Sequence, residues 1–142
     1  MSAGSCELCV QAGGEVLAEN DFLRVVLVDD AAYPGFCRVV LRAHVAEMTD
    51  LVPQDRSRMM QMVCKVESIL REIMRPDKIN LAAFGNMVPH LHWHVIPRYR
   101  DDRHFPQPVW GSAQRETDPQ VLAARHALLP QLRARLRELQ FA

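Results

Sequence analysis

The first third of the chain alternates apolar and polar residues, a pattern that indicates β-strands with one buried face. In GGEVLAENDFLRVVLVDD, residues 13–30, a glycine pair precedes two stretches rich in β-branched residues. We therefore expect a turn and two strands in this segment. YPGF, residues 33–36, interrupts the alternation, and CRVVLRA, residues 37–43, predicts a third strand.

From Pro53 to Met74 the apolar residues recur every three or four positions, which predicts one long amphipathic helix that Pro76 ends. The positions expected to face the core are Met59, Met62, Val63, Val66, Ile69, Leu70, Ile73 and Met74. The same spacing predicts a second helix over roughly Pro119 to Leu139. The chain therefore contains two segments that can cover a sheet.

Two further strands are expected after the long helix. They are KINLAAF, residues 78–84, and HLHWHVI, residues 90–96, which should end before Pro97. Residues 101–116 are rich in proline, aspartate and arginine and should be irregular. This order of elements predicts an α+β fold with a mostly antiparallel sheet. Because no linker or repeat divides the chain, we expect residues 1–142 to form a single domain.

The charge balance narrows the classes of partner. The chain has 142 residues, with 17 Lys and Arg against 17 Asp and Glu, so its formal net charge is zero. A neutral chain lacks the broad basic surface that binds duplex nucleic acid or an anionic membrane. No apolar run reaches the ~18 residues of a membrane span, and the N-terminus lacks the features of a secretory signal. We therefore expect a cytoplasmic protein whose four cysteines stay reduced.

Three of the six histidines lie within five residues, at His90, His92 and His94. On a strand, alternate side chains share one face, so these imidazoles would lie about 6.6 Å apart in one row. The residues between them are apolar and should belong to the buried face. Three interpretations are open. The histidines could be on the surface by chance, could bind a catalytic metal with residues 101–102, or could provide one imidazole for covalent catalysis.

The segment HLHWHVIPR, residues 90–98, resembles the motif that defines the histidine triad (HIT) family, His-φ-His-φ-His-φ-φ, where φ is apolar. RVVLRAHVAEMTDL, residues 38–51, is similar to that family's strand with a histidine at its end. INLAAFGNMVPHLHWH, residues 79–94, is similar to its strand and phosphate-contacting loop before the triad. The resemblance covers roughly residues 6–105 in matching order, which leaves residues 106–142 as a C-terminal extension. It implies a HIT-like fold.

The resemblance also implies a nucleotide hydrolase in which His92 attacks the α-phosphorus and forms a nucleotidyl-histidine that water then cleaves. His94 would contact the phosphate oxygens and the leaving group. The implied substrates are purine nucleoside phosphoramidates, esters or dinucleoside polyphosphates, and the implied assembly is a homodimer. The uridylyltransferase branch of the family has a glutamine at one triad position, whereas this chain has histidine at all three. The complete triad favours a hydrolase over a nucleotidyltransferase. A non-enzymatic nucleotide-binding module and a metallohydrolase are the rival functions.

By position in the matching segments, Asn80 and Asn86 are candidates for phosphate and ribose contacts. Asp29 or Asp30 could accept hydrogen bonds from ribose hydroxyls, and Arg98 could attract phosphate. Where many relatives have Gln-Ser, this chain has Asn-Met at residues 86–87, so one expected phosphate donor is missing. Each candidate also has an ordinary alternative, namely turn chemistry for the asparagines, a strand-ending aspartate, and a carboxylate partner for the arginine.

CELC, residues 6–9, is a Cys-x-x-Cys pair, and a tetrahedral zinc site would need two further nitrogen or sulfur ligands. No strand precedes Cys6, so a thioredoxin-like redox pair is not expected. By resemblance to zinc-containing HIT proteins, the ligands would be Cys6, Cys9, His44 and His90. Such a closed site would make the Zn²⁺ structural. We expect no organic cofactor, and the alternative for the cysteines is a reduced pair without metal.

The other residues of note are expected to have structural roles. Trp110 should pack beneath the irregular segment, with stacking on a base as the alternative. Cys37 and Cys64 should be small buried residues. His104 and His126 are expected on the surface rather than among ligands.

Overall fold

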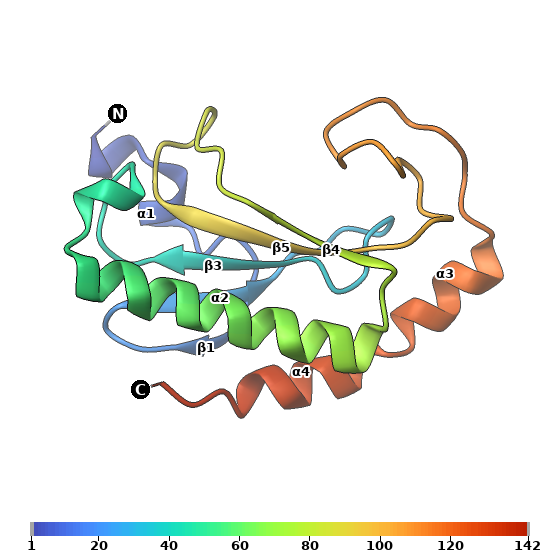
Figure 1. Ribbon diagram of the computed structural model, residues 1–142. Helices are drawn as coiled ribbons and strands as arrows, with labels where there is room; N and C mark the ends of the chain where they lie inside the picture. Colours follow the sequence, from blue (N-terminus) through green and yellow to red (C-terminus); the bar gives the residue numbers. More distant parts are fainter. Residues whose placement is uncertain (1, 142) are drawn as a thin grey trace.

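The computed structural model describes residues 2–141, which form a five-stranded antiparallel sheet with strand order β1-β2-β3-β5-β4 (Figure 1). The strands are β1 Glu15–Glu19, β2 Leu23–Leu27, β3 Cys37–Leu41, β4 Lys78–Ala82 and β5 His92–Arg98. The helices are α1 Glu7–Val10, α2 Pro53–Met74, α3 Pro119–His126 and α4 Leu129–Arg137, with short 3₁₀ turns at Ala3–Ser5 and Met48–Asp50. The predicted α+β class with an antiparallel sheet is confirmed.

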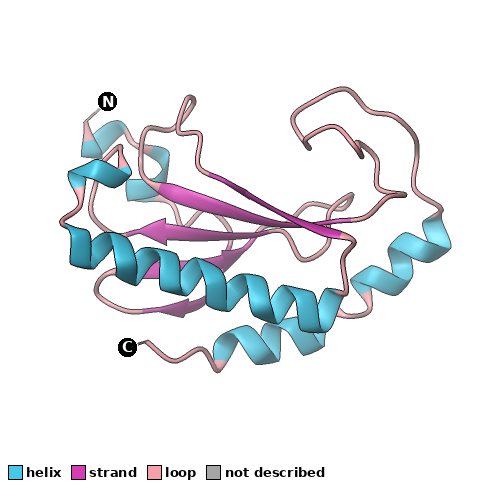
Figure 2. Cartoon of the chain, viewed as in Figure 1, coloured by secondary structure: helices cyan, strands magenta, loops and turns pink. Residues whose placement is uncertain are grey.

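Helix α2 covers one face of the sheet (Figures 1 and 2). Its bounds agree with the sequence prediction, and every predicted core position on it is buried. These side chains pack against Val39 of β3 and Val95 of β5 in the main core. Cys37 on β3 is buried as predicted, whereas the prediction of a buried Cys64 is wrong. Cys64 lies on the side of α2 that faces away from the sheet, so its thiol is exposed.

The C-terminal segment forms two helices where the sequence predicts one. α3 ends at His126 and α4 begins at Leu129. Pro130 lies in the first turn of α4, where a missing N–H is harmless, but in a continuous helix its ring would clash with the carbonyl of His126. α4 buries Leu132 and Leu136 and lies beside α2 and β1 (Figure 1). The proline therefore sets the position of the break.

Strand β5 lies between β3 and β4 and continues through Pro97, although the sequence predicts its end before the proline. Odd-numbered residues of β5 direct their N–H and C=O groups toward β3, and this pairing stops at Val95. The missing N–H of Pro97 therefore points where no strand is paired, so the proline removes no hydrogen bond from the ladder. At the other end β5 starts at His92, and His90 precedes the strand.

The opposite face of the sheet is covered only in part. One end of it packs against the N-terminal segment through an apolar cluster of Cys6, Leu8, Val26 and Val40. Two loops, residues 83–91 and residues 99–118, rise on this side from opposite ends of β5 (Figure 1). Strand alternation directs His92 and His94 to this face, because Trp93 and Val95 pack into the core beneath α2. The two histidines therefore lie between the loops.

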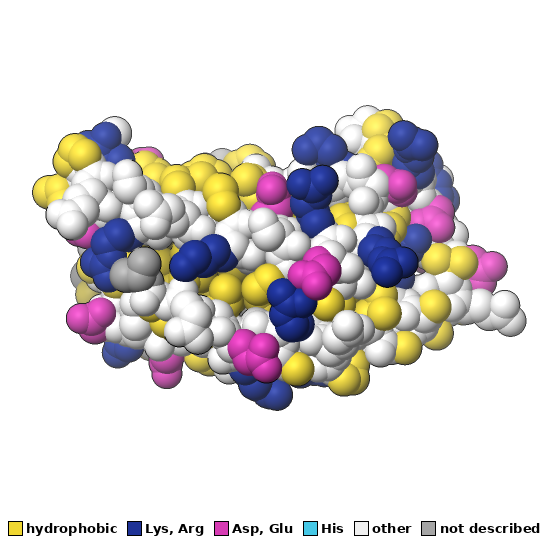
Figure 3. Space-filling model, turned by 60° about the horizontal axis from the view of Figure 1, so that its bottom comes forward, with side chains coloured by type: hydrophobic (Ala, Val, Ile, Leu, Met, Phe, Trp, Pro, Cys, Tyr) yellow, Lys and Arg dark blue, Asp and Glu magenta, His cyan; other side chains and the backbone are white. Residues whose placement is uncertain are grey.

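The face shown in Figure 3 mixes acidic, basic and apolar side chains, as expected for a chain with zero net charge. It presents no broad field of one sign. Within residues 2–141, none of the helices combines the length and the apolar character that a bilayer span requires.

Candidate functional site

A pocket of about 410 Å³ opens on the face of the sheet opposite α2. His92 and His94 contribute to its wall, with only 9% and 6% of each residue exposed, and their ring centroids lie 4.9 Å apart. The other lining residues come from β3 and the two loops: Arg38, Phe84, Gly85, Asn86, Met87, Val88 and Trp110. Two of the three triad histidines thus share one pocket, while His90 belongs to a separate cluster.

The orientation of His92 is fixed at its Nδ1. Its Nδ1–H donates to the backbone carbonyl of His90 at 2.5 Å. Because a carbonyl can only accept, the neutral ring carries its proton on Nδ1 and a lone pair on Nε2. Burial lowers the pKa of His92, an effect that the bond to His90 opposes and the guanidinium of Arg38 reinforces. Nε2 has no partner among residues 2–141 and is not sealed from solvent, so it presents a neutral nucleophile to the pocket.

His94 is contacted at Nδ1 by Arg38. The two residues lie directly opposite each other on β5 and β3, and the Nε–H of Arg38 donates to His94 Nδ1 at 3.4 Å. A second bond, from Nη1 to the Gly13 carbonyl at 2.9 Å, holds the guanidinium in place. Burial, with smaller contributions from His92 and Arg38, lowers the pKa of His94 to about 3. His94 is therefore a neutral imidazole at physiological pH.

Aromatic side chains from the two loops meet above the histidines. The rings of Phe84 and Trp110 are in edge-to-face contact at 4.8 Å, and Trp110 lies 5.0 Å from His94. Phe84 and Trp110 are 58% and 52% exposed, and Met87 beside them is 88% exposed. The expectation that Trp110 packs beneath its loop is wrong, because the loop holds its ring outward as part of the pocket wall.

Arg98 and Asn80 do not line the pocket. Arg98 is 2% exposed, and its guanidinium donates to both carboxylate oxygens of Asp102 at 2.8 and 3.1 Å. It also donates to Asn80 Oδ1 at 2.7 Å and to the Gln107 carbonyl at 2.7 Å. Burial alone would raise the pKa of Asp102, but hydrogen bonds from Arg98 and backbone N–H groups outweigh it and lower the pKa. The predicted alternative, a carboxylate partner for Arg98, is the arrangement found.

The remaining residues predicted to contact the nucleotide differ in their position relative to the pocket. Asn86 is exposed and lines the pocket. Asp29 is exposed and lies outside the set of lining residues, and Asp30 accepts the N–H of Ala32 in a turn at 3.0 Å. Only Asn86 of these residues is therefore positioned beside His92 and His94.

Cys6, Cys9, His44 and His90 converge as the sequence predicts, and this set could hold a metal ion. The nitrogen and sulfur atoms lie 3.3 to 3.5 Å apart in the pairs Cys6–His90, Cys9–His44, Cys9–His90 and His44–His90. A tetrahedron with metal–ligand bonds of about 2.0–2.3 Å has edges of roughly 3.3–3.8 Å. These four pairs therefore have the spacing of a four-coordinate zinc site, and all four ligand atoms lie within 4.8 Å of one another.

His90 is oriented for this role by a second hydrogen bond. Its Nε2–H donates to the Leu41 carbonyl at 2.6 Å, which leaves the lone pair of Nδ1 directed at the cluster. Burial lowers the pKa of His90, which favours the neutral ring that a metal ligand requires. The same residue accepts the Nδ1–H of His92 on its backbone carbonyl. The metal-binding cluster and the nucleophile are thus one hydrogen bond apart.

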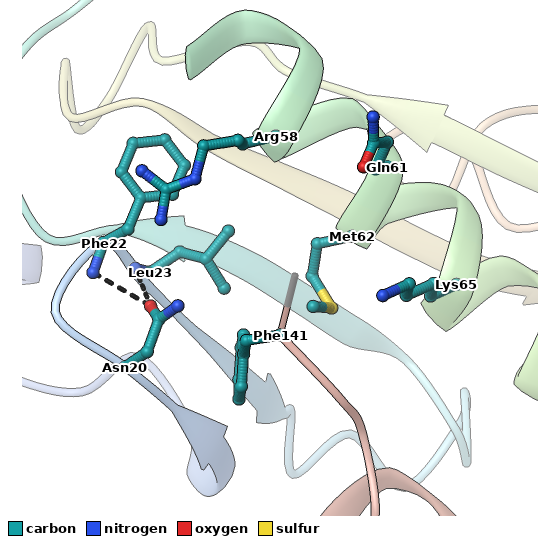
Figure 4. Close-up of a pocket in the computed structure, with 8 residues that line it drawn as sticks. All are labelled: Asn20, Phe22, Leu23, Arg58, Gln61, Met62, Lys65 and Phe141. Carbon is teal, nitrogen blue, oxygen red and sulfur yellow. Dashed lines mark hydrogen bonds between the residues drawn. The ribbon is translucent and has the colours of Figure 1, made fainter. Parts of the chain in front are cut away.

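A second hollow, on the side of the sheet that α2 covers, is too small for a nucleotide. It has a volume of about 20 Å³ between the β1–β2 turn, α2 and the C-terminal segment (Figure 4). Phe141 closes one side, and Arg58 lies over the ring of Phe22 at 4.2 Å. Lys65 of α2 donates to the carbonyl of Gln140 at 2.8 Å, and this bond holds the C-terminal segment against the helix.

Comparison with known proteins identifies the family. A model of the HIT domain matches residues 11–101, more than half of the chain. The chain belongs to the HIT family. The AP-4-A phosphorylase of Mycobacterium tuberculosis is 30% identical to this HIT protein over 122 residues, 82% of this chain and 61% of the relative. The asymmetrical bis(5'-nucleosyl)-tetraphosphatase of Schizosaccharomyces pombe is 28% identical over 74 residues, 49% of this chain and 41% of that relative.

This HIT protein therefore spans about three fifths of the length of the phosphorylase. Among solved structures, a histidine triad protein from Bradyrhizobium japonicum has a TM-score of 0.68 at 31% identity, covering 86% of this chain and 92% of that chain. A Zn-bound histidine triad family protein from Mycobacterium smegmatis shares the fold, with a TM-score of 0.58 at 21% identity over 94% and 99%. The HIT-like fold is confirmed.

Sequence reasoning missed the roles of Arg38 and Phe84 in this site. Strand alternation in CRVVLRA does place Arg38 on the face opposite the buried Cys37 and Val39. Which residue it meets, however, depends on the register between β3 and β5, and these strands are far apart in the chain. Phe84 follows β4 directly, and only the position of the second loop shows that its ring meets an aromatic partner.

Proposed function

We propose that this HIT protein is a hydrolase that cleaves nucleotides at the α-phosphate through a nucleotidyl intermediate on His92. The observation that carries this proposal is the Nε2 of His92, which is neutral, unpartnered within residues 2–141 and open to the pocket. Its substrates are nucleoside phosphoramidates, nucleoside phosphate esters or dinucleoside polyphosphates. The names of the two curated relatives support the last of these.

In the first step, the lone pair on His92 Nε2 attacks the α-phosphorus, a P–N bond forms, and the bond to the leaving group breaks. The carbonyl of His90 accepts the Nδ1–H and so stabilises the positive charge that the ring acquires. The Nε2–H of His94 donates to the oxygens on which negative charge develops. In the second step water attacks the phosphorus and loses its proton to solvent, and the electron pair of the P–N bond returns to His92.

The aromatic wall supplies a surface for the nucleobase. Phe84 and Trp110 are half-exposed and Trp110 lies next to His94, so a base can stack on this wall while its phosphate reaches the histidines. Stacking of a base on an aromatic side chain contributes about 1–3 kcal/mol, and a purine offers the larger ring. The amide of Asn86 is the proposed phosphate or ribose contact from the loop.

For the metal centre we propose structural zinc. Held by Cys6, Cys9, His44 and His90, the ion would have no open coordination position, so the chemistry it supplies is a cross-link rather than Lewis-acid catalysis. It would join the N-terminal segment to the ends of β3 and β5. The metallohydrolase alternative requires His92 and His94 as metal ligands, and among residues 2–141 the cluster that could hold a metal contains neither of them.

The decisive experiment replaces the nucleophile. His92→Ala should reduce turnover of diadenosine tetraphosphate by roughly 10⁵-fold or more, because a covalent route without its nucleophile is lost. AMP binding and the thermal unfolding temperature should change little. Mass spectrometry of the quenched wild-type reaction should show an adenylyl adduct on His92. A variant that retained near-full activity on every nucleotide that the wild type cleaves would refute the proposal.

A second candidate function is transfer of the nucleotide to phosphate, which the 30% identity to an AP-4-A phosphorylase favours. The same His92 intermediate would then be attacked by inorganic phosphate instead of water. In the reaction above, added phosphate would convert the product from AMP to ADP.

We also propose a homodimer, as the resemblance to the HIT family implies, and a hollow on α2 beside the half-buried Met60 and the exposed Cys64 offers surface for it. The molecular mass in solution tests that assembly.

A further inference from the structure

We infer that Arg38 restricts this HIT protein to substrates whose leaving group departs as an anion, such as a polyphosphate, and disfavours amine leaving groups. The inference rests on the proposed reaction at His92 and narrows its substrate class. It follows from the contact between the guanidinium of Arg38 and the ring of His94.

Arg38 is held against His94 by the sheet itself. The two residues are direct partners in the register of β3 and β5. In the same ladder the N–H of Leu41 donates to the Leu91 carbonyl, so Arg38 and His94 form a non-hydrogen-bonded pair, the kind whose side chains lie closest. The bond from Nη1 to the Gly13 carbonyl fixes the other end of the guanidinium.

The Gly13 position is itself constrained. Its φ of +85° favours glycine, and a Cβ there would lie 2.7 Å from a methyl group of Leu8. The carbonyl that anchors Arg38 therefore belongs to a turn that other residues would distort.

This contact selects one tautomer of His94. A guanidinium has only N–H donors, so His94 Nδ1 must accept and cannot carry a proton. The proton of the neutral ring then lies on Nε2, which has no partner among residues 2–141 and is accessible from the pocket. The other rings around His94 belong to Phe36, Trp110 and His92, of which only His92 titrates. A charge on His92 or Arg38 opposes a second proton on His94.

A neutral imidazole with this tautomer donates a hydrogen bond but has no spare proton to transfer, since loss of its Nε2–H would leave an imidazolate. A polyphosphate needs no proton, because it leaves as an anion that the Nε2–H stabilises. An amine must gain a proton on nitrogen as the P–N bond of a phosphoramidate breaks, which requires a general acid. Arg38 thus favours the first class of substrate over the second.

The test compares two substrates that transfer the same adenylyl group, diadenosine tetraphosphate and the adenosine 5'-phosphoramidate of a primary amine. The wild type should have the higher kcat/KM on the tetraphosphate. Arg38→Met removes both the donor and the charge. It should lower kcat/KM on the tetraphosphate roughly 10- to 100-fold, as for loss of one transition-state donor, and on the phosphoramidate less than about threefold. Arg38→Lys keeps a donor and a charge and should retain most of the preference.

Equal losses on both substrates, or a wild type that prefers the phosphoramidate, would overturn the inference. A second measurement needs no variant. In the ¹⁵N NMR spectrum of the wild type at neutral pH, the ring of His94 should be neutral, with its proton on Nε2. A proton on Nδ1, or a cationic ring, would also overturn it. If no nucleotide is cleaved, both the proposed reaction and this inference fail. If nucleotides are cleaved but His94 carries its proton on Nδ1, or the phosphoramidate is preferred, only this inference fails.

Discussion

The three triad histidines have the same side chain, yet each has a different chemical role, because one ring nitrogen of each has a different hydrogen-bond partner. His92 donates from Nδ1 to a backbone carbonyl and so has a nucleophilic Nε2. His94 accepts at Nδ1 from Arg38 and so has a donating Nε2–H. His90 donates from Nε2 to the carbonyl of Leu41 and so has a ligating Nδ1. Hydrogen bonds to neighbours, rather than residue type, therefore divide nucleophile, donor and ligand.

At this scale the buried, neutral state of His94 predicts a loss of stability in acid. Its pKa is lowered from 6.5 to about 3 in the folded protein, first by burial and then by His92 and Arg38. Between those values the unfolded chain binds a proton that the native protein does not, so the free energy of unfolding falls as pH falls below about 6.5. Urea denaturation at several pH values should show this slope.

His94→Phe is the matched control, because it keeps an aromatic ring without a titrating group. The slope below pH 6.5 should become shallower in this variant. An unchanged slope would mean that the acid sensitivity comes from other groups.

At the scale of elements, the site depends on two loops that extend from opposite ends of β5 (Figure 1). The loop of residues 99–118 is anchored by the buried Arg98–Asp102 ion pair. Arg115 adds hydrogen bonds to the carbonyls of Asp102 and Phe105, each at 2.7 Å. These bonds fix an otherwise irregular segment so that Trp110 reaches the pocket. The residue thought to bind phosphate instead positions the loop that carries the aromatic wall.

Arg98→Met should therefore destabilise the protein by about 3–5 kcal/mol, since it leaves the carboxylate of Asp102 buried without its partner. Arg103→Ala is the control on the same loop. Its ion pair with Glu116 has an N–O distance of 3.6 Å and is exposed, so its loss should change stability by less than about 1 kcal/mol. Chemical denaturation measures both, and comparable losses would show that Arg98 is not the anchor.

At the scale of the whole molecule, the metal-binding cluster joins three segments that are distant in the chain. Residues 6–9 come from the N-terminus, His44 follows β3, and His90 precedes β5. A cross-link at this point would hold the N-terminal segment over the sheet and fix the His90 carbonyl that orients His92. Both the stability of the fold and the orientation of the nucleophile would then depend on the metal.

Removal of the metal should lower the unfolding temperature by roughly 10 °C, because an ion that binds only the folded chain stabilises it by mass action. Cys6→Ser should have the same effect, with loss of zinc in elemental analysis of the purified protein. Cys64→Ser, at an exposed cysteine outside the cluster, should change neither quantity. Metal-free protein with unchanged stability would rule out the structural role.

Local pattern alone determined most of the architecture. The apolar spacing from Pro53 to Met74 predicts α2 with its observed bounds, and a strand forms in each segment predicted for one, although β5 begins at His92 and continues through Pro97. The triad motif gives the family, and the ligand set carried over from its zinc-containing members converges in space. These inferences succeed because helix and strand periodicity depends on neighbours in the chain, and because a family motif preserves its spatial arrangement.

Tertiary structure decided what neighbours in the chain could not. Arg38 meets His94 because β3 and β5 pair in one register, and Arg98 is buried because Asp102 folds back onto it. The ring of Trp110 faces the pocket, and its loop is anchored by the hydrogen bond from Arg98 to the Gln107 carbonyl. Each of these outcomes depends on contacts between segments distant in sequence, which no local pattern encodes. The sequence thus determined which chemical groups are present, and the packing of the sheet and loops determined which atoms they present to a substrate.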